Sequence, residues 1–320
     1  MRKFLFLLLA TLAWSASAET VVKIVWPFSP AGADSAMLRQ IADNANTAQT
    51  KYKFVYENRP GAGGSIAVNS VVNDRALTVL AISSSVYVRP NLYRESHDVT
   101  QLSLIGEFCS KMPLAVFSKK YSRVTDVANK DLSLGLVSGS ITQLVSKGIQ
   151  NNSNVKITEV GYKGTPEAST DMLGGHLDAS VDFLGPLTLG RMTPEVKIIG
   201  ITGDRNITGF ATFKSQQVLG LESITSTDYF FVNHTVDDAV KQELSIILAT
   251  ANQDNVKKTC SDNYGVTEKF SYDLAKKLHQ DNIARWATIT KGIERQCQLQ
   301  NNDWDITQWD PRCITARLMR

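Results

Sequence analysis

The residues best placed to do chemistry lie in a short loop near the N-terminus, where an apolar run ends and a helical pattern begins. Residues 22–25 (VKIV) suit a buried strand, and Pro27 ends it because proline cannot donate to a sheet. Asp34 or Ser35 is then expected to cap a helix with one apolar face. The first N–H groups of a helix have no partner within it, so this loop could bind an anion; the alternative is an ordinary strand-to-helix turn without a ligand.

Further polar residues follow other predicted strands. Ser83 ends the apolar run 77–82, Ser138 and Ser140 follow the run 132–137, and Asp182 lies near the end of a strand over 179–183. The carboxyl ends of parallel strands meet at one edge of a sheet, where ligands bind in open α/β folds. These hydroxyl and carboxyl groups are therefore expected near the first loop.

The segment 162–166 (YKGTP) should form a second strand-to-helix loop. Thr165 suits the N-cap position, and Pro166 suits the first helical position. Tyr162 could bind a ligand or line the cleft, and Lys163 could face a ligand or solvent. Asp182 could select a ligand amine or cap a neighbouring helix. The residue types do not decide among these roles.

The chain alternates strand and helix patterns, which indicates an α/β fold with a mostly parallel sheet and flanking helices in each of two lobes. About 300 residues exceed one ordinary core. We expect lobe 1 to comprise residues 19–110 and 233–293 and lobe 2 to comprise residues 111–232, joined by two hinge crossings. Residues 294–320 would form a C-terminal extension.

Residues 1–18 have the features of a cleavable export signal. Arg2 and Lys3 precede an apolar run over residues 4–13, and Ala16 and Ala18 form a cleavage pattern. The apolar run is too short to span a bilayer, although a retained anchor is the alternative. Removing the two basic residues lowers the formal net charge from +3 by two, to +1. The mature chain is therefore expected in the periplasm, and its charge gives no indication of nucleic-acid binding.

Four cysteines in an exported chain permit disulfides. Cys297 and Cys313 bracket a polar tail with little apolar material. A disulfide between them would order this tail, and closing a loop of that size stabilises the folded state by about 3 kcal/mol in the chain-entropy model. We favour that pairing, with Cys109 and Cys260 either bridged or free. Two buried, unpaired thiols are the alternative.

An enzyme is the competing class of protein. The sequence has no GxSxG elbow, HExxH motif or zinc-site spacing, so we expect no catalytic residues, metal or cofactor. The histidines occur singly in unrelated contexts: His97, His176, His234 and His279.

Three segments in order resemble the Bug family, the periplasmic substrate-binding proteins of tripartite tricarboxylate transporters. Residues 27–32 (PFSPAG) resemble the family's first loop, and residues 56–67 (YENRPGAGGSIA) match its second motif almost throughout. Residues 161–165 (GYKGT) and 170–178 (TDMLGGHLD) resemble its third. The resemblance covers nearly the whole mature chain to about Ile293.

This resemblance implies a two-lobed, type II periplasmic-binding-protein fold that holds a small organic acid between its lobes and delivers it to transporter membrane subunits. A carboxylate sensor that docks on a membrane signalling partner is the alternative, and in either role we expect a monomer. Carried over by position, and joined to the strand-end residues above, the candidate ligand-binding residues are Phe28, Ser29, Ala31, Gly32, Asp34, Ser35, Ser83, Ser138, Ser140, Tyr162, Lys163, Gly164, Thr165 and Asp182.

The sequence also departs from the family pattern. Ala31 replaces one of two glycines in the first loop, and the acidic residue is Asp34 where the family has an aspartate at the position of Ser35. The turn after residues 132–137 lacks the family's histidine. These differences indicate an unusual ligand or a sensing role.

Overall fold

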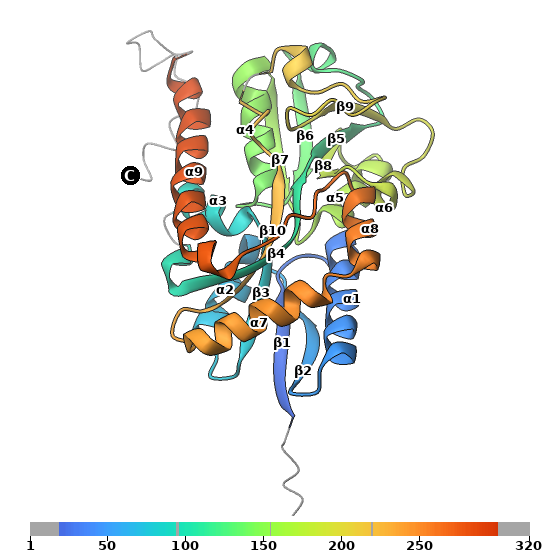
Figure 1. The fold of residues 1–320 in the computed structure, drawn as a ribbon. Coiled ribbons are helices and arrows are strands. Elements are labelled where there is room, and N and C mark those ends of the chain that lie inside the picture. Colours follow the sequence, from blue (N-terminus) through green and yellow to red (C-terminus); the bar gives the residue numbers. More distant parts are fainter. Residues whose placement is uncertain (1–18, 94–95, 154, 219, 300–320) are drawn as a thin grey trace, which may run out of the picture.

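A computed structural model describes residues 19–93, 96–153, 155–218 and 220–299, with side chains to Ile293. The chain forms two lobes, each built on a five-stranded sheet with helices against it (Figure 1). The expected export signal and most of the C-terminal extension lie outside the described residues. The two-lobed α/β fold is confirmed, and both sheets are mixed.

The first sheet has the strand order β2-β1-β3-β10-β4. Its strands β2, β1 and β3 are parallel, and β10 runs antiparallel to both of its neighbours. The strands are β1 (Thr20–Trp26), β2 (Tyr52–Asn58), β3 (Thr78–Ser83), β4 (Leu102–Met112) and β10 (Ser226–Asn233). The helices of this part are α1 (Ala33–Ala48), α2 (Ser65–Asn73), α3 (Ser85–Leu92), α7 (Asp238–Ala251), α8 (Asp254–Asp262) and α9 (Tyr272–Leu299).

The second sheet has the strand order β7-β6-β8-β5-β9, and here β5 runs antiparallel to its neighbours. Its strands are β5 (Leu114–Ser118), β6 (Asp131–Leu136), β7 (Lys156–Gly161), β8 (Ala179–Phe183) and β9 (Lys197–Ile201). The helices are α4 (Ile141–Ser153), α5 (Thr165–Leu173) and the short α6 (Pro186–Leu189). The mostly parallel sheets expected from the alternating pattern are found in both lobes. The exceptions are the strands near the crossings, β10 and β5, which run antiparallel to their neighbours.

The chain passes between the lobes near β4 and again before β10. Both β4 and β10 pair within the first sheet, and Pro113 separates β4 from β5. The proposed lobe boundaries remain a prediction, although strand pairing places residues from Ser226 in the first sheet.

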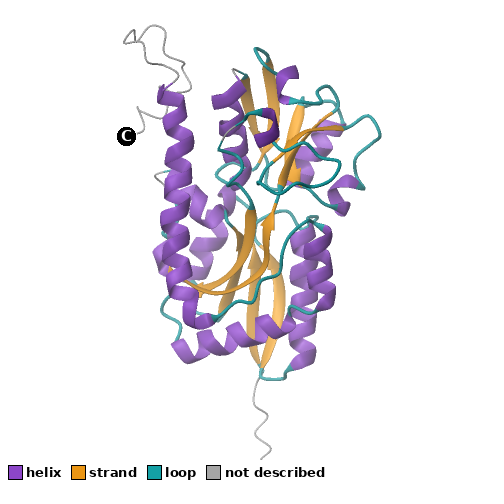
Figure 2. Cartoon of the chain, turned by 45° about the horizontal axis from the view of Figure 1, so that its top comes forward, coloured by secondary structure: helices purple, strands orange, loops and turns teal. Residues whose placement is uncertain are grey.

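Apolar side chains form a continuous core that includes residues of both sheets. One cluster contains Val25 and Leu80 of the first sheet, Leu134 and Val181 of the second, and Trp286 of α9. Helix α9 contacts α3 and β4 on one side of the crossing and α4 on the other, and it runs along the flank of the molecule (Figures 1 and 2). A second cluster lies between the first sheet and α1, α7 and α8.

Cys109 on β4 and Cys260 on α8 form a disulfide. Of the two states left open for this pair, the bridged one is therefore confirmed. Cys297 and Cys313 lie outside the residues whose side chains are described, so their pairing stays a prediction. Across the described residues, no helix combines the length and apolar character that crossing a membrane would require.

Candidate ligand-binding site

A hollow with about 420 Å³ of empty volume, including its part open to solvent, lies between the two lobes. Strands β1, β3, β6 and β8 all end at it, and helices α1, α3, α4 and α5 begin there. Its lining comprises Trp26, Phe28, Ser29, Gly32, Asp34, Ser83, Ser85, Val137, Ser140, Ile141, Thr142, Gly164, Thr165, Pro166 and Phe183. The carboxyl ends of parallel strands therefore meet at one crevice, as the sequence predicted.

The first loop is held in place by its own hydroxyl groups and by the end of β2. The Ser35 hydroxyl donates to the carbonyl of Ser29 at 3.0 Å and accepts from the Tyr56 hydroxyl at 3.0 Å. The Asn58 amide donates to the carbonyl of Phe28 at 2.5 Å. Tyr56 and Asn58, which belong to the motif over residues 56–67, thus position this loop.

Helix α1 begins after Gly32, and no side chain caps it. The expectation that Asp34 or Ser35 caps this helix is wrong, because Asp34 already lies in the first helical turn and the Ser35 hydroxyl donates back to Ser29. The amide groups at the start of α1 are consequently left for the cavity, which Gly32 and Asp34 line.

The second loop lies opposite the first. Helix α5 begins after Gly164, again without a side-chain cap, so the predicted N-cap at Thr165 is wrong by one residue. The Thr165 hydroxyl instead donates to the Asp182 carboxylate at 2.5 Å. A Cβ atom at Gly164 would lie 2.9 Å from the backbone nitrogen of Ser29, so the two loops are in contact.

Hydroxyl groups link the lobes across the cavity. The Ser83 hydroxyl donates to the Ser85 hydroxyl at 2.9 Å, and Ser85 in turn accepts from the backbone N–H of Ile141 at 3.2 Å. The Ser140 and Thr142 hydroxyls are 2.8 Å apart at the start of α4. This chain of bonds joins the ends of β3 and β6.

The structure brings together eight of the predicted site residues in the lining: Phe28, Ser29, Gly32, Asp34, Ser83, Ser140, Gly164 and Thr165. The other six stand behind it or outside it: Ala31, Ser35, Ser138, Tyr162, Lys163 and Asp182.

These six have other contacts. The Ala31 carbonyl accepts from Arg191 at 3.4 Å, and the Ser138 carbonyl accepts from Arg89 at 3.3 Å. The Tyr162 hydroxyl donates to Asp171 at 2.6 Å, and Lys163 is exposed. The residues Ser35 and Asp182 support the two loops from behind.

Asp182 is buried and accepts four hydrogen bonds. Its donors are the hydroxyls of Thr165 and Ser169, the backbone N–H of Phe183 and the guanidinium of Arg191, which lies 3.3 Å away. Burial raises the pKa of Asp182, and these donors oppose that rise. Asp182 therefore fixes the start of α5 and is shielded from the cavity.

Sequence reasoning missed seven lining residues: Trp26, Ser85, Val137, Ile141, Thr142, Pro166 and Phe183. Most of them directly precede or follow a predicted strand end, so their position in the chain could have indicated that they line the cavity. The ring of Trp26 packs edge-on against Phe28, with ring centroids 5.2 Å apart. These residues give the hollow apolar walls between its polar loops, an arrangement typical of small-molecule sites.

Two more acidic groups lie at the cavity. Asp34 lines it, and Asp228 on β10 is buried beside Ser83, another residue of the lining. Burial, together with repulsion from Asp182, raises the pKa of Asp34 to about 6. Burial and the nearby Asp34 raise the pKa of Asp228 well above its usual range. Within the described residues, no group of three or more His, Cys, Asp or Glu side chains could hold a metal ion.

The family model described as "Tripartite tricarboxylate transporter family receptor" matches residues 37–294. The chain is similar to protein BugT of Bordetella pertussis, at 23% identity with 90% of this chain and 94% of that protein covered. It also resembles a UPF0065 protein from the TAR-I ttuE-ttuC' intergenic region of Agrobacterium vitis, at 24% identity with 78% of each chain covered.

Solved structures share the fold. The periplasmic binding protein BugD superposes with a TM-score of 0.76 at 18% identity, covering 86% of this chain and 98% of that chain. MatC from Rhodopseudomonas palustris with bound malate has a TM-score of 0.74 at 17% identity, covering 85% and 99%. R. palustris Rpa4515 with adipate has a TM-score of 0.73 at 20% identity, covering 88% and 98%.

Proposed function

This chain belongs to the tripartite tricarboxylate transporter receptor family, and on that premise we propose that it captures a small organic acid between its lobes and delivers it to membrane subunits of such a transporter. One observation carries the proposal: the uncapped starts of α1 and α5 face a common cavity from opposite lobes. Helix starts attract anions through their free N–H groups and the helix dipole.

The residues proposed to contact the ligand are the cavity-lining ones, with the backbone of Gly32 and Gly164 holding a carboxylate. Hydrogen bonds to a charged group contribute about 1.5 to 3 kcal/mol each, so three or four could supply micromolar affinity, about 8 kcal/mol, after ordering costs. Relatives of the same fold were solved with malate and adipate, which supports a carboxylate ligand.

Binding and closure are proposed to be linked. A ligand that contacts both loops stabilises the closed arrangement, and the closed surface is then presented to the membrane partner. We propose that residues 1–18 direct export to the periplasm and that the receptor acts as a monomer without catalytic activity.

Calorimetry with a panel of small mono-, di- and tricarboxylates tests the proposal. We expect at least one acid to bind at micromolar concentration and to be recovered unchanged. Turnover of the acid would favour an enzyme, and no binding across the panel would contradict the receptor proposal.

The departures in the first loop favour a second candidate, a carboxylate sensor with a membrane signalling partner. Pull-down of membrane proteins with the liganded receptor separates the two roles. Recovery of transporter subunits supports delivery, and recovery of a signalling protein supports sensing.

A further inference from the structure

A pair of buried carboxyl groups lies at the first-lobe side of the cavity. Asp34 is 7% exposed and lines the cavity from the first turn of α1, whereas Asp228 on β10 is fully buried. Beyond the effect of burial, the two carboxyl groups lie close enough for Asp34 to raise the pKa of Asp228 by electrostatic repulsion. Among the described residues, neither oxygen of Asp228 has a donor of its own.

The surroundings of this pair supply little positive charge. In the sheet, Asp228 is flanked by Ser83 on β3 and by the disulfide-bonded Cys109 on β4. Asp182 on β8 adds repulsion, and the nearby Arg191 is held by Asp182. Two carboxyl groups that lie close together and out of water cannot both ionise readily, so the pair keeps one proton and one negative charge.

The cavity therefore has two unlike sides. The starts of α1 and α5 offer N–H donors, and on the acidic side the two carboxyl oxygens of Asp228 lack a donor among the described residues. Buried acceptors are costly to leave without a partner, so this side favours a ligand that brings donors of its own.

We propose that the pair Asp34–Asp228 binds the ammonium group of an amino acid whose carboxylate the helix starts hold. The inference rests on the proposed function and narrows its ligand class from organic acids to amino acids. Asp228 retains the proton, and the ionised Asp34, which lines the cavity, accepts from the ammonium. A plain dicarboxylate would instead place a second negative charge against the pair.

Matched ligands that differ by one amino group test this directly. The purified receptor is titrated calorimetrically at pH 7.5 with L-aspartate and succinate, L-glutamate and glutarate, and L-leucine and 4-methylpentanoate. We expect at least one amino acid to bind tenfold or more tightly than its partner, the range that one charge-assisted hydrogen bond provides. Equal binding within every pair, or tighter binding of the plain acids, overturns the inference but leaves the receptor function standing. Failure of all six to bind overturns the inference, and the wider carboxylate panel then decides the function.

Variants locate the effect. Asp34→Asn should lower affinity for the amino acid at least tenfold, whereas affinity for the plain acid should hold or rise because the negative charge facing it is removed. Asp228→Asn replaces the protonated carboxyl group with a neutral amide of the same shape and leaves Asp34 ionised, so it should keep the preference. Asp131→Asn, on the exposed start of β6, is the matched control and should change neither affinity more than twofold. Circular dichroism confirms that each variant is folded. A preference that survives Asp34→Asn overturns the inference.

The pH dependence gives an independent readout that does not need a variant. Protonating Asp34 removes the negative charge that the ammonium requires, so affinity for the amino acid should fall about tenfold between pH 7.5 and pH 5. Affinity for the plain acid should hold or rise over the same range. An amino-acid affinity that rises on acidification contradicts the assigned role of the pair.

Discussion

Gly164 and Gly32 both line the cavity, but only one of them touches the opposite lobe. A Cβ atom at Gly164 would meet Ser29 across the cleft, whereas at Gly32 the nearest atom is the Ser29 carbonyl oxygen at 3.8 Å. We expect Gly164→Ala to weaken ligand binding at least tenfold, because the added methyl group keeps the loops apart. Gly32→Ala should change affinity less than threefold.

Calorimetry with whichever acid the panel identifies measures both variants. Gly32→Phe should weaken binding far more than Arg59→Ala, because Gly32 lines the cavity and Arg59 is paired with Glu57 outside it. Equal losses for Gly32→Phe and Arg59→Ala would count against the loop site.

The acidic pair also makes stability depend on pH. The folded-state pKa of Asp34 is raised from 3.8 to about 6, so its stabilising contribution is complete below pH 3.8 and is lost as pH rises through 6. Asp228→Asn removes the cost of keeping this carboxyl group protonated in the fold, and should raise the free energy of unfolding at pH 8 by on the order of 2 kcal/mol. Urea unfolding at pH 4.5 and pH 8 measures this. A variant less stable than wild type at pH 8 would sink the explanation.

The residues of the site were only partly predictable. Polar residues at strand ends could be found from position, because the strand and helix patterns are local. The acidic pair could not, since Asp34 and Asp228 are far apart in sequence and meet only because β10 returns beside β3. Likewise, nothing local in the sequence indicates that Ala31 accepts from Arg191.

At the scale of elements, the glycine-rich turn between β2 and α2 touches the second lobe. Gly63 has a φ of 55°, and a Cβ atom there would lie 2.8 Å from the Arg89 guanidinium and also meet the carbonyl of Ser138. We expect Gly63→Ala to weaken ligand binding about tenfold without touching the ligand, because it obstructs closure. Gly292→Ala on α9 is the control, because an added Cβ atom there would meet nothing within 4 Å in the part of the chain that the structure describes, and it should leave affinity unchanged.

The positions of strands and helices along the chain were largely predictable, but the pairing of strands within each sheet was less predictable. The alternation of strand and helix patterns predicted the α/β architecture of the two lobes. Helices α3 and α8 were not predicted. In α3, Pro90 interrupts the usual helical pattern, and α8 has few apolar residues, of which Val256 and Cys260 are buried. The antiparallel insertion of β10 and β5 depends on where the chain crosses, which no local pattern specifies.

The disulfide ties α8 to the crossing strand β4. Its cysteines are separated by 151 residues, so the bridge removes much freedom from the unfolded chain. The double variant Cys109→Ala and Cys260→Ala should lower the free energy of unfolding by about 5 kcal/mol in the chain-entropy model. Chemical denaturation measures the loss, and a change below about 0.5 kcal/mol would show that the bridge is not stabilising.

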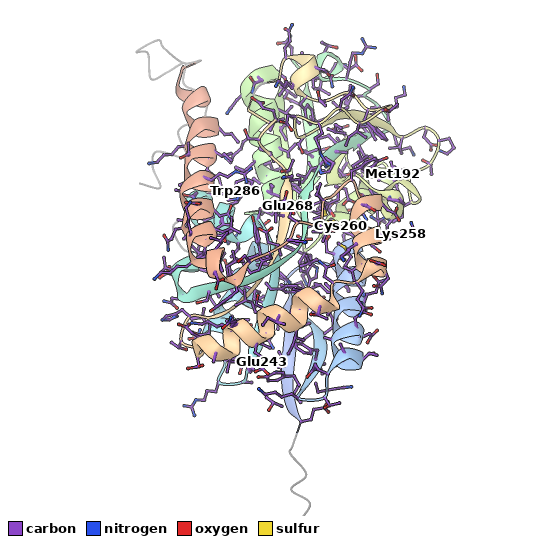
Figure 3. The ribbon with its side chains drawn as sticks, viewed as in Figure 1. Met192, Glu243, Lys258, Cys260, Glu268 and Trp286 are labelled. Atoms are coloured by element: carbon purple, nitrogen blue, oxygen red, sulfur yellow. A yellow bond between two sulfur atoms is a disulfide. The ribbon has the colours of Figure 1, made fainter. Side chains whose placement is uncertain are left out.

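On the scale of the whole molecule, α9 connects the lobes. It contacts α3 and β4 in one lobe and α4 in the other, and its Trp286 side chain is fully buried in the cluster shared by both sheets (Figure 3). A shared core predicts that the lobes unfold together, in one calorimetric transition whose enthalpy equals the van't Hoff value. Two separate transitions for the wild-type chain would contradict this coupling.

Trp286→Ala tests the connection itself. Removing this side chain should lower the free energy of unfolding by about 3 to 5 kcal/mol and broaden or divide the transition, because it empties part of the core that both lobes share. Ile246→Ala on α7 is the control, since Ile246 is 60% exposed and should change stability by less than about 0.5 kcal/mol. Scanning calorimetry of both variants beside the wild type gives the comparison. A variant at Trp286 that melts at the wild-type temperature would mean that the crossing strands, and not α9, hold the lobes together.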